Sequence, residues 1–310
     1  MNYKVYKLSF NSPVHFGKNQ LSDSEYSICS DTVFSALCIE TLCMGEGAID
    51  KIVDLARNGD LIISDALPYI KDTYLIPKPY VFVDKESDEN SSVLKKAFKK
   101  LKYITFDDID AFVNGSFDVM NAVDISDLGV EGVKVSASVR NEEEQTVPYD
   151  VGYYLFNEDC GLYIIAGFKN GEAEQLLDSI FDQLQHSGLG GKRSSGYGRF
   201  TYVTEPLDDR VVDRIDGEGT AYFLLNTALP KESELSDAVV EARYSLAKRS
   251  GFIASVTYSD TTQRKKDLVM FKAGSCFKNR FEGDVYDVSS EIGKHPVYRY
   301  GKPMFMRINI

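Results

Sequence analysis

The fold is decided by residues 161–203, GLYIIAGFKNGEAEQLLDSIFDQLQHSGLGGKRSSGYGRFTYV. Residues 161–168 are an apolar run rich in aromatic and branched side chains, which predicts a strand. Residues 172–186 carry apolar side chains at helical spacing, which predicts an amphipathic helix, and Gly188 is placed to end it. Residues 199–203 predict another strand. This region therefore has the order strand, helix, glycine-rich loop, strand.

The residues before this region complete the pattern. Residues 3–10 alternate and predict a strand, and residues 33–43 place apolar side chains on one helical face. Residues 133–139 and 151–156 predict the two strands of a hairpin with residues 140–150 as its long tip. The order strand, helix, strands, helix, strand is that of a ferredoxin-like domain. The sequence therefore predicts an α+β fold.

A variable insertion is expected at about residues 80–135. Residues 84–92 are polar and turn-prone, residues 93–101 predict a short basic helix, and residues 105–131 are acidic and irregular. The N-terminal domain is therefore expected to span residues 1–205 and to carry this insertion.

A domain boundary is expected near residues 205–219. Beyond it, four stretches predict a second strand-rich unit: 220–230, 251–258, 266–277 and 302–310. We therefore expect a C-terminal domain at residues 206–310, as a divergent copy of the first architecture.

The charge of the chain is unevenly distributed. Its 310 residues carry a formal net charge of -12, which argues against a phosphate-binding surface over the whole molecule. Residues 243–280, however, hold nine lysines and arginines against Asp260 and Asp267, and residues 294–307 hold four basic residues and no acid. An acidic remainder and a basic face suit a subunit that contacts both RNA and protein.

Metal and membrane sites are not expected. The five cysteines include no pair at CxxC spacing, and the three histidines are far apart in sequence, so we expect no zinc or other metal. The acidic pairs Asp107-Asp108 and Asp208-Asp209 lie in polar segments and are interpreted as solvated acids. No stretch approaches the roughly 18 apolar residues of a membrane span, and no signal peptide is visible, so we expect a cytoplasmic protein.

The loop at residues 186–200 contains five glycines, with Lys192, Arg193 and Arg199 and no acidic residue. It matches neither a P-loop, since Arg193 follows Gly191-Lys192, nor a dinucleotide fingerprint, since a helix precedes it and a strand follows it. The serine nucleophile elbow is absent as well. Glycine backbones that approach a ligand closely and bidentate arginines suit an extended polyanion, whereas a flexible turn with solvated basic residues is the alternative.

The loop resembles the glycine-rich loop of the RAMP proteins of CRISPR systems, whose core is a pair of ferredoxin-like, RRM-like folds. In order and spacing, further stretches resemble the guide-capping RAMP subunit of type III-A (Csm) effector complexes: VHFG (14–17), SDTVFSALC (30–38), YSLAKRSGFIAS (244–255), FKAGSCF (271–277) and HPVYRYGKPMF (295–305). Residues 80–135 carry no part of this resemblance beyond the expected variable insertion.

The resemblance implies a non-catalytic RNA-binding subunit without cofactor. It implies binding of the 5′ repeat-derived tag of the guide RNA, docking of the large polymerase-like signature subunit and of the backbone RAMP subunit, and target RNA nearby. It also implies a thumb-like hairpin that disrupts base pairing next to the tag, formed here by the hairpin around residues 140–150 or by the insertion. The tip sequence NEEEQT departs from this expectation because it is acidic.

Phosphate pairing is expected for the basic residues of the loop, hydrogen bonds for its serines and glycines, and base stacking for Tyr197. The predicted RNA-binding residues are His15, Phe16, Gly17, Ser30, Asp31, Thr32, Arg140, Gly190, Gly191, Lys192, Arg193, Ser194, Ser195, Gly196, Tyr197, Gly198, Arg199, Lys248, Arg249, Ser250, Lys272, His295, Arg299 and Tyr300.

Several of these residues have a second interpretation that the sequence leaves open. Residues 30–32 are also helix N-cap candidates, and residues 248–250 and 264–266 also fit solvated turns or loops. His295, Arg299 and Tyr300 combine stacking and phosphate-pairing chemistry, with a tyrosine core cluster as the alternative.

Two other functions remain open. Some RAMP relatives cleave repeat RNA with a histidine, so a metal-independent repeat-RNA endoribonuclease that uses His15 is one alternative. Such cleavage needs a second acid or base near the 2′-hydroxyl, and the residues that follow His15 in sequence are Phe16 and Gly17, which offer none. A pure protein-interaction scaffold is the other alternative.

Overall fold

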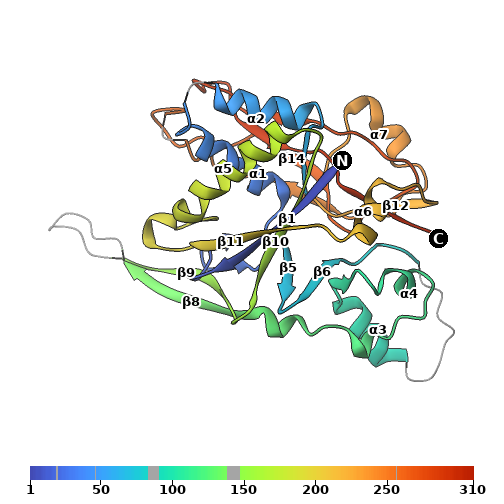
Figure 1. Cartoon of the computed structure of the whole chain (residues 1–310). Helices are drawn as coiled ribbons and strands as arrows, with labels where there is room; N and C mark the ends of the chain where they lie inside the picture. The colour runs from blue at the N-terminus through green and yellow to red at the C-terminus, as the bar shows by residue number, and fades with distance from the viewer. Residues whose placement is uncertain (19, 46, 83–90, 138–146, 256) are drawn as a thin grey trace.

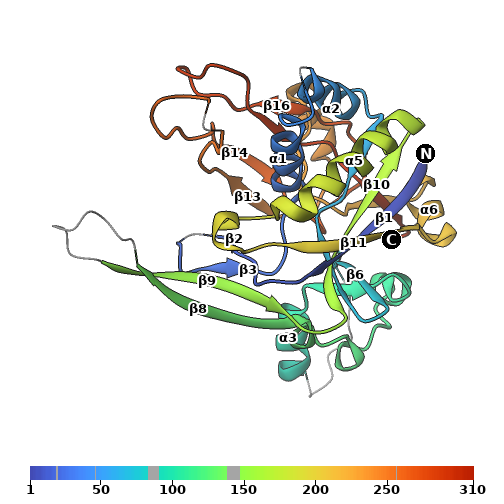
Figure 2. The same cartoon turned by 60° about the vertical axis from the view of Figure 1, so that its left-hand side comes forward.

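The structure is a computed structural model that describes residues 1–18, 20–45, 47–82, 91–137, 147–255 and 257–310, without the side chains of residues 91–94. Figures 1 and 2 show two views of the chain. Helices and antiparallel strands are mixed throughout, so the predicted α+β class is confirmed.

A seven-stranded sheet forms the centre of the molecule, with strand order β11-β1-β10-β5-β6-β7 and β4 paired to β10. All of these pairs are antiparallel. The strands are β1 (Asn2–Phe10), β4 (Leu61–Ile63), β5 (Leu67–Ile70), β6 (Thr73–Pro77), β7 (Tyr103–Thr105), β10 (Cys160–Phe168) and β11 (Phe200–Pro206). The predicted strands at 3–10, 161–168 and 199–203 are thus neighbours in the order β11-β1-β10, with β11 at the edge of the sheet. The ferredoxin-like arrangement of this half stays a prediction.

Helices α1 (Ser30–Thr41), α2 (Ala48–Arg57) and α5 (Gly171–Ser187) cover one face of this sheet (Figure 1). Helix α5 begins at Asn170, whose side chain accepts a hydrogen bond from the Ala173 N–H at 3.0 Å. It ends at Gly188, whose φ of 82° is accessible to glycine at little cost. The helix predicted at residues 172–186 and its glycine stop are therefore confirmed.

Both faces of the central strands are buried. Tyr6, Leu8 and Leu162 point into the cluster formed with α1, α2 and α5. On the opposite face, Val5, Tyr163 and Ile165 pack with side chains of the insertion and of residues 221–308. The second half of the chain therefore packs against the sheet of the first half.

A long hairpin projects from the body of the molecule (Figures 1 and 2). Its strands are β8 (Gly129–Ala137) and β9 (Pro148–Phe156), paired in continuous antiparallel register. The predicted hairpin is therefore confirmed in its strands. Of its predicted tip, residues 148–150 belong to β9, and residues 140–146, with Arg140, lie outside the described residues. Near its base lies the small pair β2 (Phe16–Gly17) and β3 (Ser24–Glu25).

The expected insertion contains more regular structure than its polar sequence indicates. The predicted basic helix is α3 (Ser91–Lys100), and β7 adds a strand to the central sheet. Short helices occupy much of the stretch expected to be irregular: α4 (Ile109–Val113), η1 (Val119–Asn121) and η2 (Ile125–Leu128). They form because Ile109, Phe112 and Val119 bury apolar side chains in the core.

The strands of the second half fall into three small sheets. These are β15-β12-β18, β13-β14 and β16-β17, from β12 (Ala221–Leu224), β13 (Leu246–Arg249), β14 (Leu268–Phe271), β15 (Cys276–Phe277), β16 (Val285–Asp287), β17 (Tyr298–Tyr300) and β18 (Phe305–Ile308). Two helices accompany them: α6 (Asp209–Asp216) and α7 (Glu232–Ala238). The domain boundary and a ferredoxin-like arrangement of this half stay predictions.

The strand expected at residues 251–258 is absent from its described residues, which make one isolated bridge between Phe252 and Arg264. Gly251 bends the backbone with a φ of 140°, and the Tyr258 N–H closes a local turn on the Ser255 carbonyl. The apolar pattern here reflects partial burial of a loop rather than strand pairing.

Candidate nucleic-acid interface

A groove of about 1360 Å³ brings together segments that are far apart in sequence. Its lining includes residues 15–18, the outer face of α1, the glycine loop and strand β13. Among the predicted RNA-binding residues, the groove is lined by His15, Phe16, Gly17, Thr32, Gly190, Gly191, Arg193, Lys248, Arg249 and Lys272.

The glycine loop closes one wall of the groove by packing directly on residues 15–16. The Gly191 N–H donates to the His15 carbonyl at 2.8 Å, and the Gly198 N–H donates to the Pro13 carbonyl at 2.9 Å. A Cβ atom at Gly190 would lie 2.8 Å from the Phe16 ring, and one at Gly191 would lie 2.8 Å from the His15 ring. The glycines therefore allow two backbone segments to approach more closely than side chains permit.

The polar residues of the loop differ in how free they are. Ser194, Ser195 and Arg199 are exposed. The Lys192 ammonium lies 4.9 Å from the ring centre of Tyr149 on the projecting hairpin. The Arg193 guanidinium is half-buried and pairs with the buried Glu40 carboxylate at 3.3 Å. Arg193 is thus held in place, whereas Arg199 faces solvent.

His15 is buried beneath the loop. Its Nδ1 lies 2.7 Å from the carbonyl oxygen of Gly152 in β9. Because a carbonyl oxygen only accepts, Nδ1 carries a proton, and in the neutral ring Nε2 is an acceptor. Among the described residues that line the groove, His15 is the one histidine.

The groove is basic although the chain is acidic. Four carboxylates line its described part, Asp23, Glu25, Asp65 and Glu131, against eight basic side chains: Lys18, Lys78, Lys99, Lys102, Arg193, Lys248, Arg249 and Lys272. A concave surface with an excess of positive charge attracts a polyanion.

Sequence reasoning missed part of this lining. Lys18, Lys78, Lys99 and Lys102 are spread over four elements or loops, and Tyr153 lies on the projecting hairpin. The basic run of α3 was the one available signal, and it was assigned to the insertion rather than to the site.

The N-terminus of α1 corrects the capping prediction. The N-cap residue is Cys29, and Ser30 and Asp31 lie in the first helical turn. The Ser30 N–H is satisfied instead by the Asp65 carboxylate at 2.7 Å, which also accepts from the Thr227 N–H at 2.8 Å. The Asp65 carboxylate, from another segment of the chain, therefore accepts the hydrogen bond at the helix start that the hydroxyl groups of Ser30 and Thr32 were expected to accept.

Asp31 is the centre of a buried ion-pair network. Its carboxylate accepts two hydrogen bonds from Arg249, at 3.0 and 2.7 Å, and a third from Arg299 Nη1. Burial opposes ionisation, but the guanidinium groups of Arg249 and Arg299 hold the pKa of Asp31 below its usual value. Asp31 thus binds arginines of β13 and β17 and does not face the groove.

Several residues predicted to contact RNA lie inside the protein. Ser30, Tyr197, Arg299 and Tyr300 are buried. The Tyr300 hydroxyl accepts the Ile63 N–H at 3.0 Å, and its ring packs near Phe34, as the tyrosine-core alternative expected. In this structure these side chains stabilise the wall behind the groove instead of lining it.

His295 lies in a different place from His15. Its Nε2 is 2.9 Å from the Ser255 hydroxyl, its Nδ1 is 2.9 Å from the Pro296 carbonyl, and its ring meets the edge of Tyr258. It organises the loops of residues 250–265 and 287–298 and does not line the groove.

No group of three or more histidine, cysteine or acidic side chains in the described part of the chain could hold a metal ion. The acidic pairs are explained by ion pairing, since Arg210 contacts both Asp107 and Asp208 at the surface. No helix within the described ranges is both long and apolar enough to cross a membrane.

Comparison with known proteins identifies relatives over the whole chain. The model of the CRISPR Csm4 C-terminal domain family matches residues 217–308. The chain is 36% identical over 309 residues to the CRISPR system Cms protein Csm4 of Mycobacterium tuberculosis (strain ATCC 25618 / H37Rv), covering 99% of this chain and 98% of the relative. It is 31% identical to the protein of the same name from Streptococcus thermophilus, covering 100% of both chains.

Solved structures show the same fold. A chain of the Csm3-Csm4 subcomplex in the type III-A CRISPR-Cas interference complex is similar with a TM-score of 0.68 and 19% identity, over 100% of both chains. A chain of the Csm1-Csm4 cassette in complex with cA4 is similar with a TM-score of 0.65 and 18% identity, over 99% of this chain and 98% of the other. The fold is therefore RAMP-like, as in these chains of CRISPR effector complexes. The chain belongs to the Csm4 family of type III-A complexes.

Proposed function

We propose that this chain is a non-catalytic subunit of a type III-A CRISPR interference complex and caps the 5′ repeat-derived tag of the guide RNA. The observation that carries the proposal is the groove, which gathers the glycine loop, residues 15–17 and β13 into one basic surface. Tag binding by this surface fixes which end of the guide carries the rest of the complex.

The chemistry of the groove suits RNA better than a small ligand. Arg199, Ser194 and Ser195 do not line the groove, but they are exposed on the same loop and offer phosphate and 2′-hydroxyl contacts there. The lysines and arginines of the lining extend this charge along the groove, as a backbone of several nucleotides requires. Arg193 and Lys192 add donors held near the loop.

Two protein partners complete the proposal. The relatives solved with Csm3 and with Csm1 support docking of this chain to a backbone RAMP subunit and to the large polymerase-like subunit. The β8–β9 hairpin is the better candidate for the thumb, because it projects from the body of the molecule (Figure 2) and contributes residues to the groove lining. Glu131, Val133 and Tyr153 at its base line the groove.

The non-catalytic assignment rests on the surroundings of His15. Its Nδ1 is engaged by Gly152, and the groove offers no second histidine among its described lining residues to serve as partner acid or base. The alternative endoribonuclease predicts metal-independent cleavage of repeat RNA that His15→Ala abolishes while RNA binding survives. Under our proposal neither the wild-type chain nor the variant cleaves.

The experiment is to express the chain with its genomic neighbours, purify the assembly through a tag on this chain, and sequence the 5′ ends of the bound RNA. We expect RNAs that share one short repeat-derived 5′ end. Arg193→Ala combined with Arg199→Ala should reduce their recovery, and should reduce both RNA affinity and its salt dependence, by about 0.7 in slope per lost phosphate contact.

A matched control removes two basic side chains outside the groove, Arg210→Ala with Lys278→Ala. Both side chains are paired with acids at the surface, and neither lines the groove. Random or absent RNA in the wild-type assembly would contradict tag capping and favour a pure protein-interaction scaffold. Equal losses in the two double variants would contradict the assignment of the glycine loop.

A further inference from the structure

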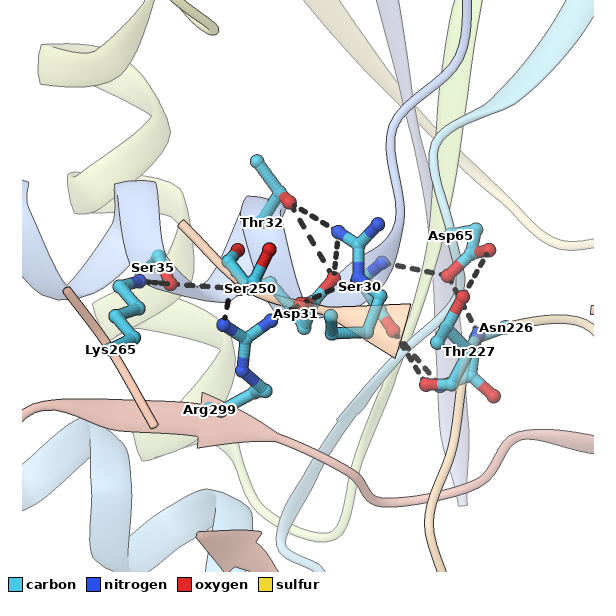
Figure 3. A network of polar contacts seen from close by, with 11 residues as sticks. Ser30, Asp31, Thr32, Ser35, Asp65, Asn226, Thr227, Ser250, Lys265 and Arg299 are labelled. Atoms are coloured by element: carbon cyan, nitrogen blue, oxygen red, sulfur yellow. Dashed lines mark hydrogen bonds and ion pairs between the residues drawn. The ribbon is translucent and has the colours of Figure 1, made fainter. Parts of the chain in front are cut away.

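Two arginines bind one carboxylate where α1 meets the second half of the chain, and a lysine lies beside it. Figure 3 labels the carboxylate Asp31 together with Arg299 and Lys265. We call this cluster of Arg249, Lys265 and Arg299 around Asp31 the cationic corner. Arg249 and Arg299 bind the Asp31 carboxylate directly, and the Lys265 ammonium donates to the Ser35 hydroxyl at 3.0 Å. The corner thus joins α1, β13, β17 and the loop that precedes β14.

The acids nearby do not neutralise the corner. Asp31 is shared by two arginines, Asp65 is committed to the backbone at the start of α1, and Asp267 pairs with Lys248 at 2.7 Å. Burial, and then the charge of Arg299, lowers the pKa of Lys265. Positive charge therefore remains in excess, and an anion would stabilise it.

Unused donors point to the same conclusion. Arg299 is 3% exposed, and its buried Nε has no hydrogen-bond partner. Arg249 donates through Nε and Nη2 to Asp31 and through Nη2 to Thr32, while no acceptor for Nη1 is found among the described residues. Among the described residues, Arg299 Nε is the one buried side-chain nitrogen or oxygen atom without a partner, whereas Arg249 Nη1 is not among these buried atoms and is therefore open to water or to a ligand.

The corner opens on the groove through one side of α1. Arg249, whose side chain is 24% exposed, lines the groove together with Thr32 and Ser35. Thr32 and Ser35 are three residues apart, so their hydroxyls lie on one face of the helix. One helical turn therefore presents two hydroxyls to the groove. The Arg249 guanidinium donates to that of Thr32, and the Lys265 ammonium, which is not among the lining residues of the groove, donates to that of Ser35.

We propose that Arg249 and Lys265, with the hydroxyls of Thr32 and Ser35, form a subsite for one phosphate group of the bound RNA, and that Asp31 positions Arg249 for it. Asp31 accepts two hydrogen bonds from the Arg249 guanidinium. This bidentate contact fixes the direction of the remaining nitrogen, Nη1. The Ser35 hydroxyl already donates to the Asp31 carbonyl at 2.9 Å, so the donors offered to a phosphate are Arg249 Nη1 and the Lys265 protons that are not bonded to Ser35. The inference rests on the proposed function, because it assigns one contact within the RNA-binding groove.

The test is a scan of the RNA backbone against variants of the full assembly. The probe is a synthetic copy of the RNA that co-purifies with it, with a single uncharged methylphosphonate linkage moved through its first ten or so positions. For wild type, one linkage served by the corner should lower affinity about tenfold when neutralised. For Arg249→Ala with Lys265→Ala, affinity should be about tenfold lower throughout and that linkage should have no further effect.

Two controls keep the scan interpretable. Arg249→Lys retains the positive charge but not the paired donors of the planar guanidinium. This variant should fold as wild type does and still lose most of the RNA affinity. Lys278→Ala removes an exposed lysine paired with Glu241, outside the groove, and should reproduce the wild-type scan. Circular dichroism melting of each variant verifies that the binding measured is that of folded protein.

The role of Asp31 has its own readout. Asp31→Asn should lower RNA affinity in the wild-type background and have no effect when Arg249 is already alanine, because Asp31 acts through that side chain. A merely structural role would lower affinity equally in both backgrounds and would overturn the positioning role.

The outcomes separate this inference from the function on which it rests. If the wild-type assembly binds no RNA, tag capping and the subsite both fail. If Arg193→Ala with Arg199→Ala weakens binding while the Arg249 and Lys265 variant binds and scans like wild type, the subsite alone is overturned.

Discussion

At the scale of single residues, Asp65 shows how a buried carboxylate links the two halves of the chain. Its Oδ1 accepts the N–H groups of Ser30 and Thr227, which lie 197 positions apart. Burial raises the pKa of Asp65 to about 6, although those hydrogen bonds oppose the rise. The protonated carboxyl is therefore favoured more strongly in the folded chain than in the unfolded chain.

This shift predicts a pH dependence of stability. A raised pKa in the folded state stabilises the fold fully at low pH, and that contribution is lost as pH rises through about 6. Asp65→Asn keeps an oxygen for both N–H groups and cannot titrate. From about pH 7.5 to about pH 5, we expect the wild type to gain about 1 kcal/mol of unfolding free energy relative to Asp65→Asn.

Urea unfolding of both proteins at each pH measures this difference, in which the contributions of all other titrating groups cancel. A pH dependence that is the same in the two proteins would show that Asp65 does not titrate with a raised pKa.

At the scale of elements, the glycine loop contains two glycines with similar backbones and different surroundings. Gly196 has a φ of 86° and nothing within 4 Å of an added Cβ, whereas Gly198 has a φ of 76° and an added Cβ would lie 2.1 Å from the Leu189 carbonyl oxygen. Gly196→Ala should therefore cost about 1 kcal/mol, from the left-handed backbone alone. Gly198→Ala should cost about 3 kcal/mol or more, because the loop must also open.

Thermal or urea unfolding compares the two variants, and each serves as the control for the other. Equal destabilisation would mean that close packing against Leu189 does not shape the loop.

Most elements of the first half follow from local patterns. The strand at residues 3–10, helix α5 with its cap and glycine stop, and the hairpin strands each have a periodicity that fits one structure. Residues 251–258 show where prediction from local patterns fails. Their branched and aromatic side chains predict a strand, but the described residues of this range form a loop with one isolated bridge.

The candidate site was predictable only in part for a related reason. Glycines and basic residues of one loop are visible in the sequence, but the partners of Asp31 lie 218 and 268 positions away. Sequence spacing alone therefore assigned Asp31, Arg299 and Tyr300 to the RNA, where the structure uses them to join α1 to the second half.

At the scale of the whole molecule, the acidic chain concentrates positive charge where its two halves meet. The central sheet is covered on one face by α1, α2 and α5 and on the other by the insertion and the second half. This packing brings β13 beside α1 and the glycine loop, so the groove exists only when both halves are folded together.

The measurement that tests the central claim most directly is ultraviolet cross-linking of the guide RNA in the purified assembly, followed by mass spectrometry of the cross-linked peptides of this chain. We predict cross-links in residues 14–18, 188–200 and 246–249, because the groove is lined by residues 15–18, 188–191, 193 and 246–249 of these segments. Cross-links confined to other surfaces, such as α6 and α7, in an assembly that carries guide RNA would contradict the claim that this groove binds the RNA.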